Sequence, residues 1–449
     1  MTTALETSLR VPPSQVHEVI SRHMLADGMA LVLDLEKSHG AWLYDSRRQR
    51  ELLDFFTCFS SYPMGYNHPK MTTPEFRDRI LRAAVVKPAN ADLYTTLMAE
   101  FVATFARIVP EPYRRHLFFV SGGSLAVENA LKAAFDWKVR KNLAAGKGEK
   151  GQQVIHLRQA FHGRSGYTLS LTNTADPNKT QYFPKFPWPR VSNPKLSFPV
   201  TEEVLARVER DERQAIAEVE QALRDHPDDV AALILEPIQG EGGDNHFRRE
   251  FLQALRDLAD EHDFLLVFDE IQTGFATTGK WWCCEHFDVL PDIFAFGKKT
   301  QVCGIAATSR LDEVESVFQV SSRINSTWGG NLADMVRCQR FIEIIEEDGL
   351  LDNASRIGQH LLDGLARLAE VFSGSVSNVR GRGLFLAFDL PSGEIRDRAL
   401  RVANDHDLLA LKCGPQSLRF RPPLILSREE ADEGLRRIET SLRQVLAAG

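Results

Sequence analysis

The chain has 449 residues, of which 43% are hydrophobic and 26% charged, values that are typical of a globular protein and exclude a disordered or collagen-like one. At this length a folded chain buries about three quarters of its unfolded surface, so its core needs no disulfides. The formal net charge of −7 argues against a nucleic acid partner, which would need clustered Lys and Arg. Because no stretch approaches about 18 consecutive apolar residues, we expect no membrane-spanning helix.

The six cysteines predict neither a disulfide framework nor a metal site. No two have the spacing Cys-x-x-Cys, and the adjacent pair Cys283 and Cys284 does not suit tetrahedral zinc. Reduced thiols are typical of a cytoplasmic protein. Residues 1–21 lack the apolar core of a secretory signal. We therefore expect a cytoplasmic protein without a structural metal.

In chain order, residues 1–66 are predicted to form an N-terminal arm, a segment of a small domain, with short strands such as residues 41–44. In residues 67–331, short apolar runs alternate with helical patterns such as residues 250–261, which is typical of a parallel α/β sheet. Runs of continuous apolar character predict strands buried on both faces. These runs are residues 117–120, 154–157, 231–235, 264–268 and 293–296.

Two further stretches complete the predicted organisation. Residues 172–200 contain six prolines, which exclude a regular helix or a central strand and favour a long surface excursion, a lid or an interface loop. Residues 332–449 predict a smaller α+β domain, with a helix from about residue 333 that ends at Gly349 and a last amphipathic helix at residues 428–446.

A glycine turn predicts an anion-binding site. Gly122, Gly123 and Ser124 follow a predicted strand and open a helix, whose first N–H groups and partial positive charge favour a phosphate. Neither the P-loop spacing nor the dinucleotide-binding spacing is present. Such a turn alone is structural about as often as it is functional.

Ionisable side chains also follow two of the buried strands. Asp269 and Glu270 come at the carboxyl edge where open α/β sheets bind ligands, although a solvated pair is the alternative. Lys298 and Lys299 end another strand, and a lysine buried there needs a partner or a covalent role. We expect Lys298 to have that role and Lys299 to be solvated.

Together these motifs resemble the class III (ω-amino acid) aminotransferases, fold-type I enzymes that use pyridoxal 5′-phosphate. The resemblance runs from about Phe55 to the last helix, and its most specific part is Asp269 followed by Gly297 and Lys298, 28 and 29 residues later. It implies an α/β fold with a mostly parallel central sheet in the large domain, and an obligate homodimer with its active sites at the interface. The stretch 122–125 departs from the family's usual Ser-Gly-Ala/Thr-Glu, but backbone donors serve either way.

Segments such as residues 161–167, 239–244 and 325–331 further resemble members that act on lysine. The resemblance implies transfer of the ε-amino group of L-lysine to 2-oxoglutarate, giving L-glutamate and 2-aminoadipate 6-semialdehyde. The alternatives are another ω-aminotransferase acting on ornithine, 4-aminobutyrate or a similar amine, a mutase or decarboxylase on this fold, and a non-catalytic member. The presence of Lys298 and Asp269 disfavours the last.

The resemblance also assigns roles to residues around the cofactor ring. Lys298 would hold the cofactor covalently and move a proton between it and the substrate carbon. Asp269 would pair with the pyridinium nitrogen, and Gln272 would hydrogen-bond the phenolic oxygen. Phe161 and Ile271 would contact the two ring faces.

The phosphate and the substrate are assigned to further residues. Gly123 and Ser124 would hold the phosphate together with Thr327 of the neighbouring subunit. Of the substrate-binding residues, Arg164 would hold the distant carboxylate and Arg419 the one beside the reacting carbon. Glu241 would pair with Arg419 when no carboxylate is adjacent, aided by the freedom of the flanking glycines 240, 242 and 243, and Asn325 completes the set. His162 is expected to be structural and Arg421 to face outward.

Overall fold

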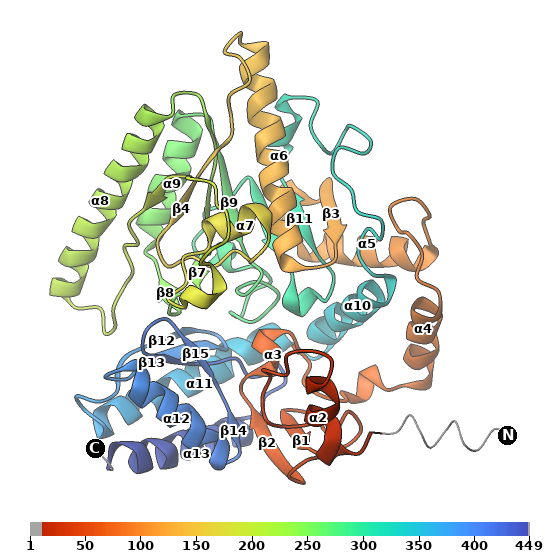
Figure 1. Ribbon diagram of the computed structural model, residues 1–449, viewed down its shortest axis with the longest axis vertical. Coiled ribbons are helices and arrows are strands. Elements are labelled where there is room, and N and C mark those ends of the chain that lie inside the picture. Colours follow the sequence, from red (N-terminus) through yellow and green to blue (C-terminus); the bar gives the residue numbers. More distant parts are fainter. Residues whose placement is uncertain (1–10, 448–449) are drawn as a thin grey trace.

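The computed structural model describes residues 11–447 and has a larger part packed on a smaller one (Figure 1). The first ten residues of the predicted N-terminal segment, and with them half of the stretch predicted to lack a secretory signal, lie outside the described residues. Among residues 11–447, none of the helices is long and apolar enough to cross a membrane.

The larger part is built around a seven-stranded sheet. In spatial order its strands are β3 (His116–Val120), β11 (Cys303–Ala307), β10 (Ile293–Phe296), β9 (Leu265–Asp269), β6 (Val230–Leu235), β4 (Gln153–Leu157) and β5 (Arg190–Val191). Only β11 runs antiparallel to its neighbours, and the other four pairings are parallel. This confirms the predicted mostly parallel sheet and its five predicted strands.

Besides the two-residue edge strand β5, strand β11 is the part of this sheet that the apolar pattern does not reveal. Its sequence is short and made largely of small residues, including Gly304. A Cβ atom at Gly304 would lie 2.1 Å from the carbonyl oxygen of Phe118. Close approach of two backbones therefore requires glycine here, which lowers the strand signal.

Alternate residues of the central strands pack against helices on opposite faces of the sheet. Along β6, Ala232 and Ile234 join a cluster with α6 (Gly123–Ala144), whereas Leu233 and Leu235 join one with α9 (Arg249–Glu261). Burial on both faces explains the continuous apolar runs. The predicted helix at residues 250–261 is α9. The long α8 (Glu202–Asp225) lies beside α9 on the same side (Figure 1).

The proline-rich residues 172–200 contain a single 3₁₀ turn, η4 (Pro177–Lys179), and the two-residue edge strand β5. The exclusion of a regular helix and of a central strand is confirmed. The segment is not wholly a surface excursion, because Trp188 and Val191 are buried. Trp188, which precedes β5, and Val191 within it anchor this end of the segment to the sheet.

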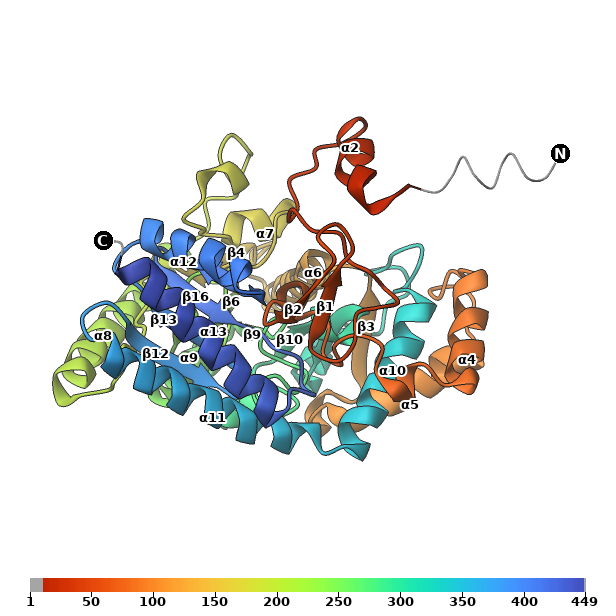
Figure 2. The ribbon, with the colours of Figure 1, turned by 90° about the horizontal axis from the view of Figure 1, so that it is seen from below.

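The smaller part holds a four-stranded sheet with helices on its outer side (Figure 2). Its strands are β12 (Ser377–Arg382), β13 (Phe385–Asp389), β16 (Ser417–Phe420) and β15 (Leu411–Cys413), and its helices are α11 (Leu350–Val371), α12 (Gly393–Asp405) and α13 (Arg428–Leu446). The predicted last helix is α13. A second sheet pairs β1 (Trp42–Asp45) and β2 (Arg50–Asp54) with β14 (Leu408–Leu409), joining the N-terminal segment to this part.

Helix α10 (Leu332–Glu347) links the two parts. Gly349 follows it with φ +61°, the left-handed conformation expected just after a helix end, so the predicted end is confirmed. The helix packs against α4 (Pro74–Val85) and α5 (Thr96–Ile108) of the larger part, although the predicted domain boundary at residue 331 assigns it to the smaller one. The boundary itself stays a prediction.

Candidate active site

The carboxyl ends of five strands, β3, β4, β6, β9 and β10, meet at one edge of the large sheet and surround a cavity of about 200 Å³. The residues that line it are Gly123, Ser124, Phe161, His162, Gly163, Glu236, Asp269, Ile271, Gln272 and Lys298. Seven of the eight residues predicted to bind the cofactor are among them, Thr327 being the exception. An edge of this kind is where open α/β sheets bind ligands.

Asp269, the last residue of β9, is held in one orientation by two donors. Its Oδ2 lies 2.9 Å from Nδ1 of His162, and its Oδ1 accepts a hydrogen bond of 3.1 Å from the backbone N–H of Ile271. Both side chains are buried. His162, expected to be merely structural, is therefore a positioning residue for the predicted partner of the pyridinium nitrogen.

Lys298 follows β10 in a 3₁₀ turn and lines the same cavity. Its φ of +54° is uncommon for a residue other than glycine, and strain of this kind concentrates at functional sites. Burial lowers the pKa of its amine, the Asp269 carboxylate opposes this, and the Arg419 guanidinium lowers the pKa further. A lowered pKa leaves more of the neutral, nucleophilic amine.

Lys299 is buried, and the expectation that it is solvated is wrong. Only 1% of the residue is exposed, and its Nζ donates a hydrogen bond of 2.8 Å to the backbone oxygen of Gln272. The 3₁₀ turn at Lys298 directs the next side chain beneath the loop after β9. Burial lowers its pKa well below the ordinary value, and the charge of Lys298 acts in the same direction.

The turn between β3 and α6 has the geometry of a phosphate cradle. Gly122 has φ +106°, and α6 begins at Gly123 with free N–H groups. A Cβ atom at Gly163 would lie 2.3 Å from Oγ of Ser124, so glycine is needed where the two loops meet. A helix N-terminus beside a half-buried lysine, a buried carboxylate and the Phe161 ring fits pyridoxal phosphate.

A larger cleft of about 970 Å³ adjoins the cofactor cavity. Arg419 of β16 lines it and, being buried, donates through Nη1 a hydrogen bond of 3.1 Å to Oε1 of Gln272, which lines the smaller cavity. Its buried Nε has no hydrogen-bond partner among residues 11–447. The guanidinium therefore retains donor capacity for a carboxylate near the reacting position.

Glu241 also lines this cleft, but the expected ion pair with Arg419 is not formed. Its Oε1 instead accepts hydrogen bonds from Nζ of Lys179 at 2.7 Å and Oγ1 of Thr174 at 2.8 Å. The pairing of Glu241 with Arg419 when no carboxylate is adjacent stays a prediction, as does the freedom of the flanking glycines to move. A Cβ atom at Gly242 would lie 2.0 Å from the backbone oxygen of Gln159, so the backbone is closely packed at this position.

Arg421 is buried, and the expectation that it faces outward is wrong. It binds both carboxylate oxygens of Asp244, at 2.9 and 2.6 Å, and its guanidinium carbon lies 3.3 Å from the ring centroid of Phe385. Residues two apart on an extended chain share a face, so Arg421 follows Arg419 inward. The pair with Asp244 compensates the buried charge.

Three predicted residues lie outside both cavities. Arg164, Asn325 and Thr327 are exposed and line neither of them. Their predicted roles stay predictions, and for Thr327 the role already assumes a neighbouring subunit.

Glu236, which directly follows β6, is a site residue that sequence reasoning missed. It is buried, and its two oxygens accept hydrogen bonds from the backbone N–H groups of Phe161 and Gly240, at 3.0 and 2.9 Å. Burial raises its pKa to about 7 from an ordinary 4.5; the His162 ring lowers it and the charge of Asp269 raises it. A carboxyl group at a strand end of this sheet edge was the available signal.

We expect Glu236 to make stability fall as pH rises. Because its pKa is higher in the folded chain, the unfolded chain loses the proton first between pH 4.5 and about 7, and this group's contribution falls by about 3 kcal/mol across that window. Glu236→Gln removes this slope. Urea unfolding of both cofactor-free proteins from pH 4.5 to 8 measures it, and parallel profiles would contradict the assignment.

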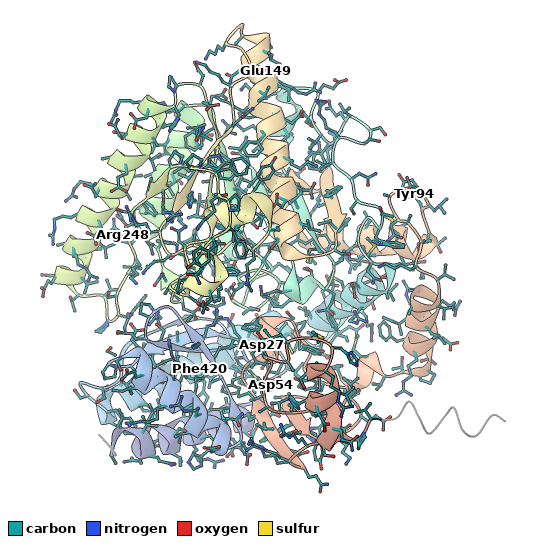
Figure 3. The ribbon with its side chains drawn as sticks, in the orientation of Figure 1. Asp27, Asp54, Tyr94, Glu149, Arg248 and Phe420 are labelled. Carbon is teal, nitrogen blue, oxygen red and sulfur yellow. The ribbon has the colours of Figure 1, made fainter. Side chains whose placement is uncertain are left out.

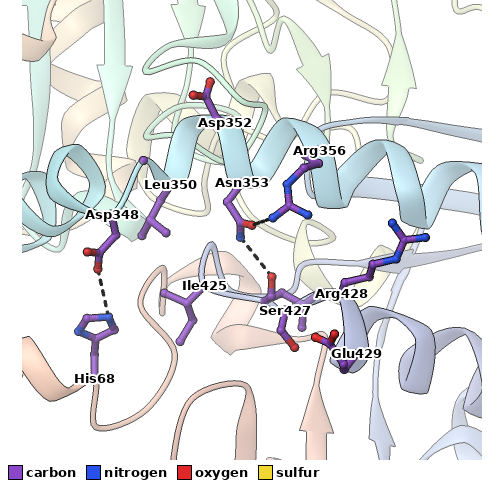
Figure 4. Close-up of a pocket in the computed structure, with 12 residues that line it drawn as sticks. His68, Asp348, Leu350, Asp352, Asn353, Arg356, Ile425, Ser427, Arg428 and Glu429 are labelled. Carbon is purple, nitrogen blue, oxygen red and sulfur yellow. Dashed lines mark hydrogen bonds and ion pairs between the residues drawn. The ribbon is translucent and has the colours of Figure 1, made fainter.

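Another hollow, of about 760 Å³, lies between α11 and the start of α13 (Figure 4). His68 and Asp348 face each other there at 3.7 Å, and Arg356 donates to Asn353. This hollow contains neither a buried lysine nor a glycine cradle. The cavity at the sheet edge is therefore the candidate active site. Among the side chains of residues 11–447, no group of three or more His, Cys, Asp or Glu could hold a metal ion.

Comparison with known proteins identifies the family. The family model for aminotransferase class-III matches residues 24–442. The L-lysine-epsilon aminotransferase of Amycolatopsis lactamdurans is 52% identical over 430 residues, 95% of each chain, and that of Mycobacterium tuberculosis is 50% identical over 433 residues, 96% of each chain. A solved structure of lysine aminotransferase from M. tuberculosis in the internal aldimine form has a TM-score of 0.94 at 49% identity, covering 97% of this chain and 100% of that one. The chain belongs to the class III aminotransferases, which use pyridoxal 5′-phosphate.

Proposed function

We propose that the protein moves the ε-amino group of L-lysine to 2-oxoglutarate, giving 2-aminoadipate 6-semialdehyde and L-glutamate. Relatives named for this activity are about half identical over nearly the whole chain. The observation that carries the proposal is the placement of Arg419 and Glu241, opposite charges that share one cleft beside the Lys298 cavity.

The chemistry divides between the cofactor and the chain. Bound pyridoxal phosphate supplies an electron sink for the carbon that loses its proton. The Lys298 amine takes and returns that proton. The Asp269 carboxylate, fixed by His162, supplies a negative charge in a buried site, where it acts without reorganisation. Arg419 binds the carboxylate beside the reacting carbon of L-glutamate and 2-oxoglutarate.

One cleft must accept two unlike substrates. Glutamate reacts at a carbon with an adjacent carboxylate, whereas lysine reacts at a carbon without one. Nη1 of Arg419 lies 4.0 Å from Oδ1 of Asp244, but both oxygens of that carboxylate bind Arg421 at shorter distances. Without a closer carboxylate, a buried Arg419 against the methylene chain of lysine would be costly, since a buried charge needs a partner. Glu241, in the same cleft, is the carboxylate that can supply it.

We expect Glu241→Ala to impair the reaction with lysine at least about tenfold more than the reaction with glutamate, because only lysine leaves Arg419 unpaired. Rapid-mixing absorbance of the aldehyde form of the cofactor with each amine, followed separately, measures the two half-reactions. The isosteric Glu241→Gln serves as a control for lost packing. Equal losses with both amines would contradict the role of Glu241.

We further propose a homodimer with shared active sites. Thr327 and Asn325 are exposed beside Trp328, and the backbone N–H of Asn90 donates to the Trp328 oxygen, which places Asn90 against this loop. Tyr94 is 81% exposed and projects from the edge of the molecule (Figure 3). Exposed apolar side chains beside predicted phosphate ligands favour burial by a second copy.

Mixing two inactive variants tests the shared site. Lys298→Ala removes the lysine, and Thr327→Asp places a charge against the phosphate of the other subunit. A hybrid dimer then has one site with both native residues, so random mixing should restore about a quarter of the wild-type activity. Each variant alone should stay inactive. Absence of any recovery, with dimers present by light scattering, would contradict sharing of Thr327.

We also propose that the protein works in the cytoplasm. All six cysteines are free thiols, five of them buried. Proteins that keep several unpaired thiols are typical of reducing compartments.

A further inference from the structure

Two cationic side chains, Lys179 and Arg419, line the same large cleft as the carboxylate of Glu241. The first is Lys179, in the η4 turn of the proline-rich segment, whose Nζ lies 2.7 Å from Oε1 of Glu241. The Oγ1 of Thr174 donates to the same oxygen at 2.8 Å. Together these two donors hold Glu241 in the position that the structure shows.

The second cation is Arg419. Glu241 directly follows Gly240, and a Cβ atom at Gly240 would lie 2.5 Å from Oε1 of Gln272, the atom that accepts from Nη1 of Arg419. The residue that precedes Glu241 therefore lies close in space to the hydrogen bond between Arg419 and Gln272. The unpartnered Nε of Arg419 is a donor available to a carboxylate in the cleft.

We propose that Lys179 is a specificity-determining residue, one that holds Glu241 away from Arg419 and thereby keeps the cleft ready for substrates with a carboxylate beside the reacting carbon. The inference rests on the proposed function. With Glu241 on Lys179 and Thr174, Arg419 is free to bind glutamate or 2-oxoglutarate. With Glu241 on Arg419, the cleft suits the uncharged chain of lysine.

The physical basis is a competition between two positions of one side chain. A ligand that needs Arg419 binds only the fraction of molecules in which Glu241 is elsewhere, and its apparent dissociation constant rises as that fraction falls. Loss of Lys179 removes the cation that binds Glu241 in the first position and leaves Arg419, the cation of the second position, unchanged. The Lys179–Glu241 pair is part-exposed, with 30% and 20% of the two side chains accessible, so we expect a moderate effect, about fivefold.

Glutarate is a dicarboxylate that lacks a reactive carbonyl, so it binds without turnover. Its affinity measures the fraction of molecules in which Glu241 leaves Arg419 available. Calorimetric titration of the holoenzyme should give a dissociation constant at least about fivefold higher for Lys179→Met than for wild type. Lys179→Arg should restore binding, because it retains the cation. Lys185→Met, a change of an exposed lysine in the same segment, is the matched control and should leave binding unchanged.

The half-reactions supply the second readout. Lys179→Met should weaken the reaction with glutamate and leave the reaction with lysine unchanged or faster, the opposite of Glu241→Ala. In a Glu241→Ala background, Lys179→Met should have no effect on glutarate, since no carboxylate remains to compete. A direct attraction between Lys179 and the ligand would persist in that background and would overturn the proposal.

Unchanged glutarate binding in Lys179→Met, or equal losses with lysine and glutamate, would also overturn it. These outcomes are distinct from failure of the proposed function, which would appear as a wild-type enzyme that does not react with lysine.

Discussion

Replacing Lys298 with alanine is expected to lower the turnover of lysine and 2-oxoglutarate at least about 10³-fold. The change removes both the covalent holder of the cofactor and the amine that moves the proton, and a positioned acid–base group alone contributes about 10²- to 10⁴-fold. Steady-state assays with added cofactor measure the loss. Within the part of the chain that the structure describes, no other lysine lines the cofactor cavity, so we expect no neighbour to replace it.

Borohydride reduction and peptide mapping identify the lysine directly. The purified protein should be yellow, and the reduced cofactor should be found on Lys298. Lys299→Met is the matched control, because its buried amine donates to the Gln272 backbone rather than into the cavity. The label should stay on Lys298 in that variant. A label on Lys299, or activity retained by Lys298→Ala, would overturn the assignment.

Asp269→Asn is expected to retain cofactor yet to slow proton abstraction about 10²- to 10³-fold. The amide keeps the size of the carboxylate but lacks the negative charge that holds the ring nitrogen protonated, and buried electrostatic groups have effects of this size. Because His162 and the N–H of Ile271 orient the carboxylate, its charge is aimed before the substrate binds.

Single-turnover absorbance of the cofactor-loaded variant with lysine measures this step. The cofactor content, read from the same spectrum, separates slow chemistry from poor loading. Wild-type rates in a fully loaded Asp269→Asn protein would show that the charge is not required.

Much of the fold could be predicted because local pattern and burial agree. Strands buried on both faces appear as apolar runs, and the Gly349 turn and helix α13 carry their own end signals. Strand β11 could not be predicted in the same way, because Gly304 is there for the contact with Phe118. Such a contact joins residues nearly two hundred positions apart, and no local pattern records it.

The candidate site shows the same difference between local motifs, which could be predicted, and contacts between distant segments, which could not. Residues carried on one motif, such as Asp269 and Gln272, were assigned from the sequence and line one cavity. The ion-pair partners that come from distant segments could not be predicted from the sequence. The inward turn of Arg421 depends on Asp244, and the position of Glu241 depends on Lys179 in the proline-rich segment. Ion pairs of this kind are decided by tertiary packing, which one sequence does not display.

The nitrogen that reaches glutamate tests the proposed function most directly. The enzyme is incubated with 2-oxoglutarate and lysine carrying ¹⁵N at either the ε or the α position, and the glutamate formed is analysed by mass spectrometry. Ornithine and 4-aminobutyrate are tested as competing donors. We predict ¹⁵N-glutamate from ε-labelled lysine and unlabelled glutamate from α-labelled lysine. Label transferred from the α position, or glutamate formed from ornithine or 4-aminobutyrate but not from lysine, would contradict the account.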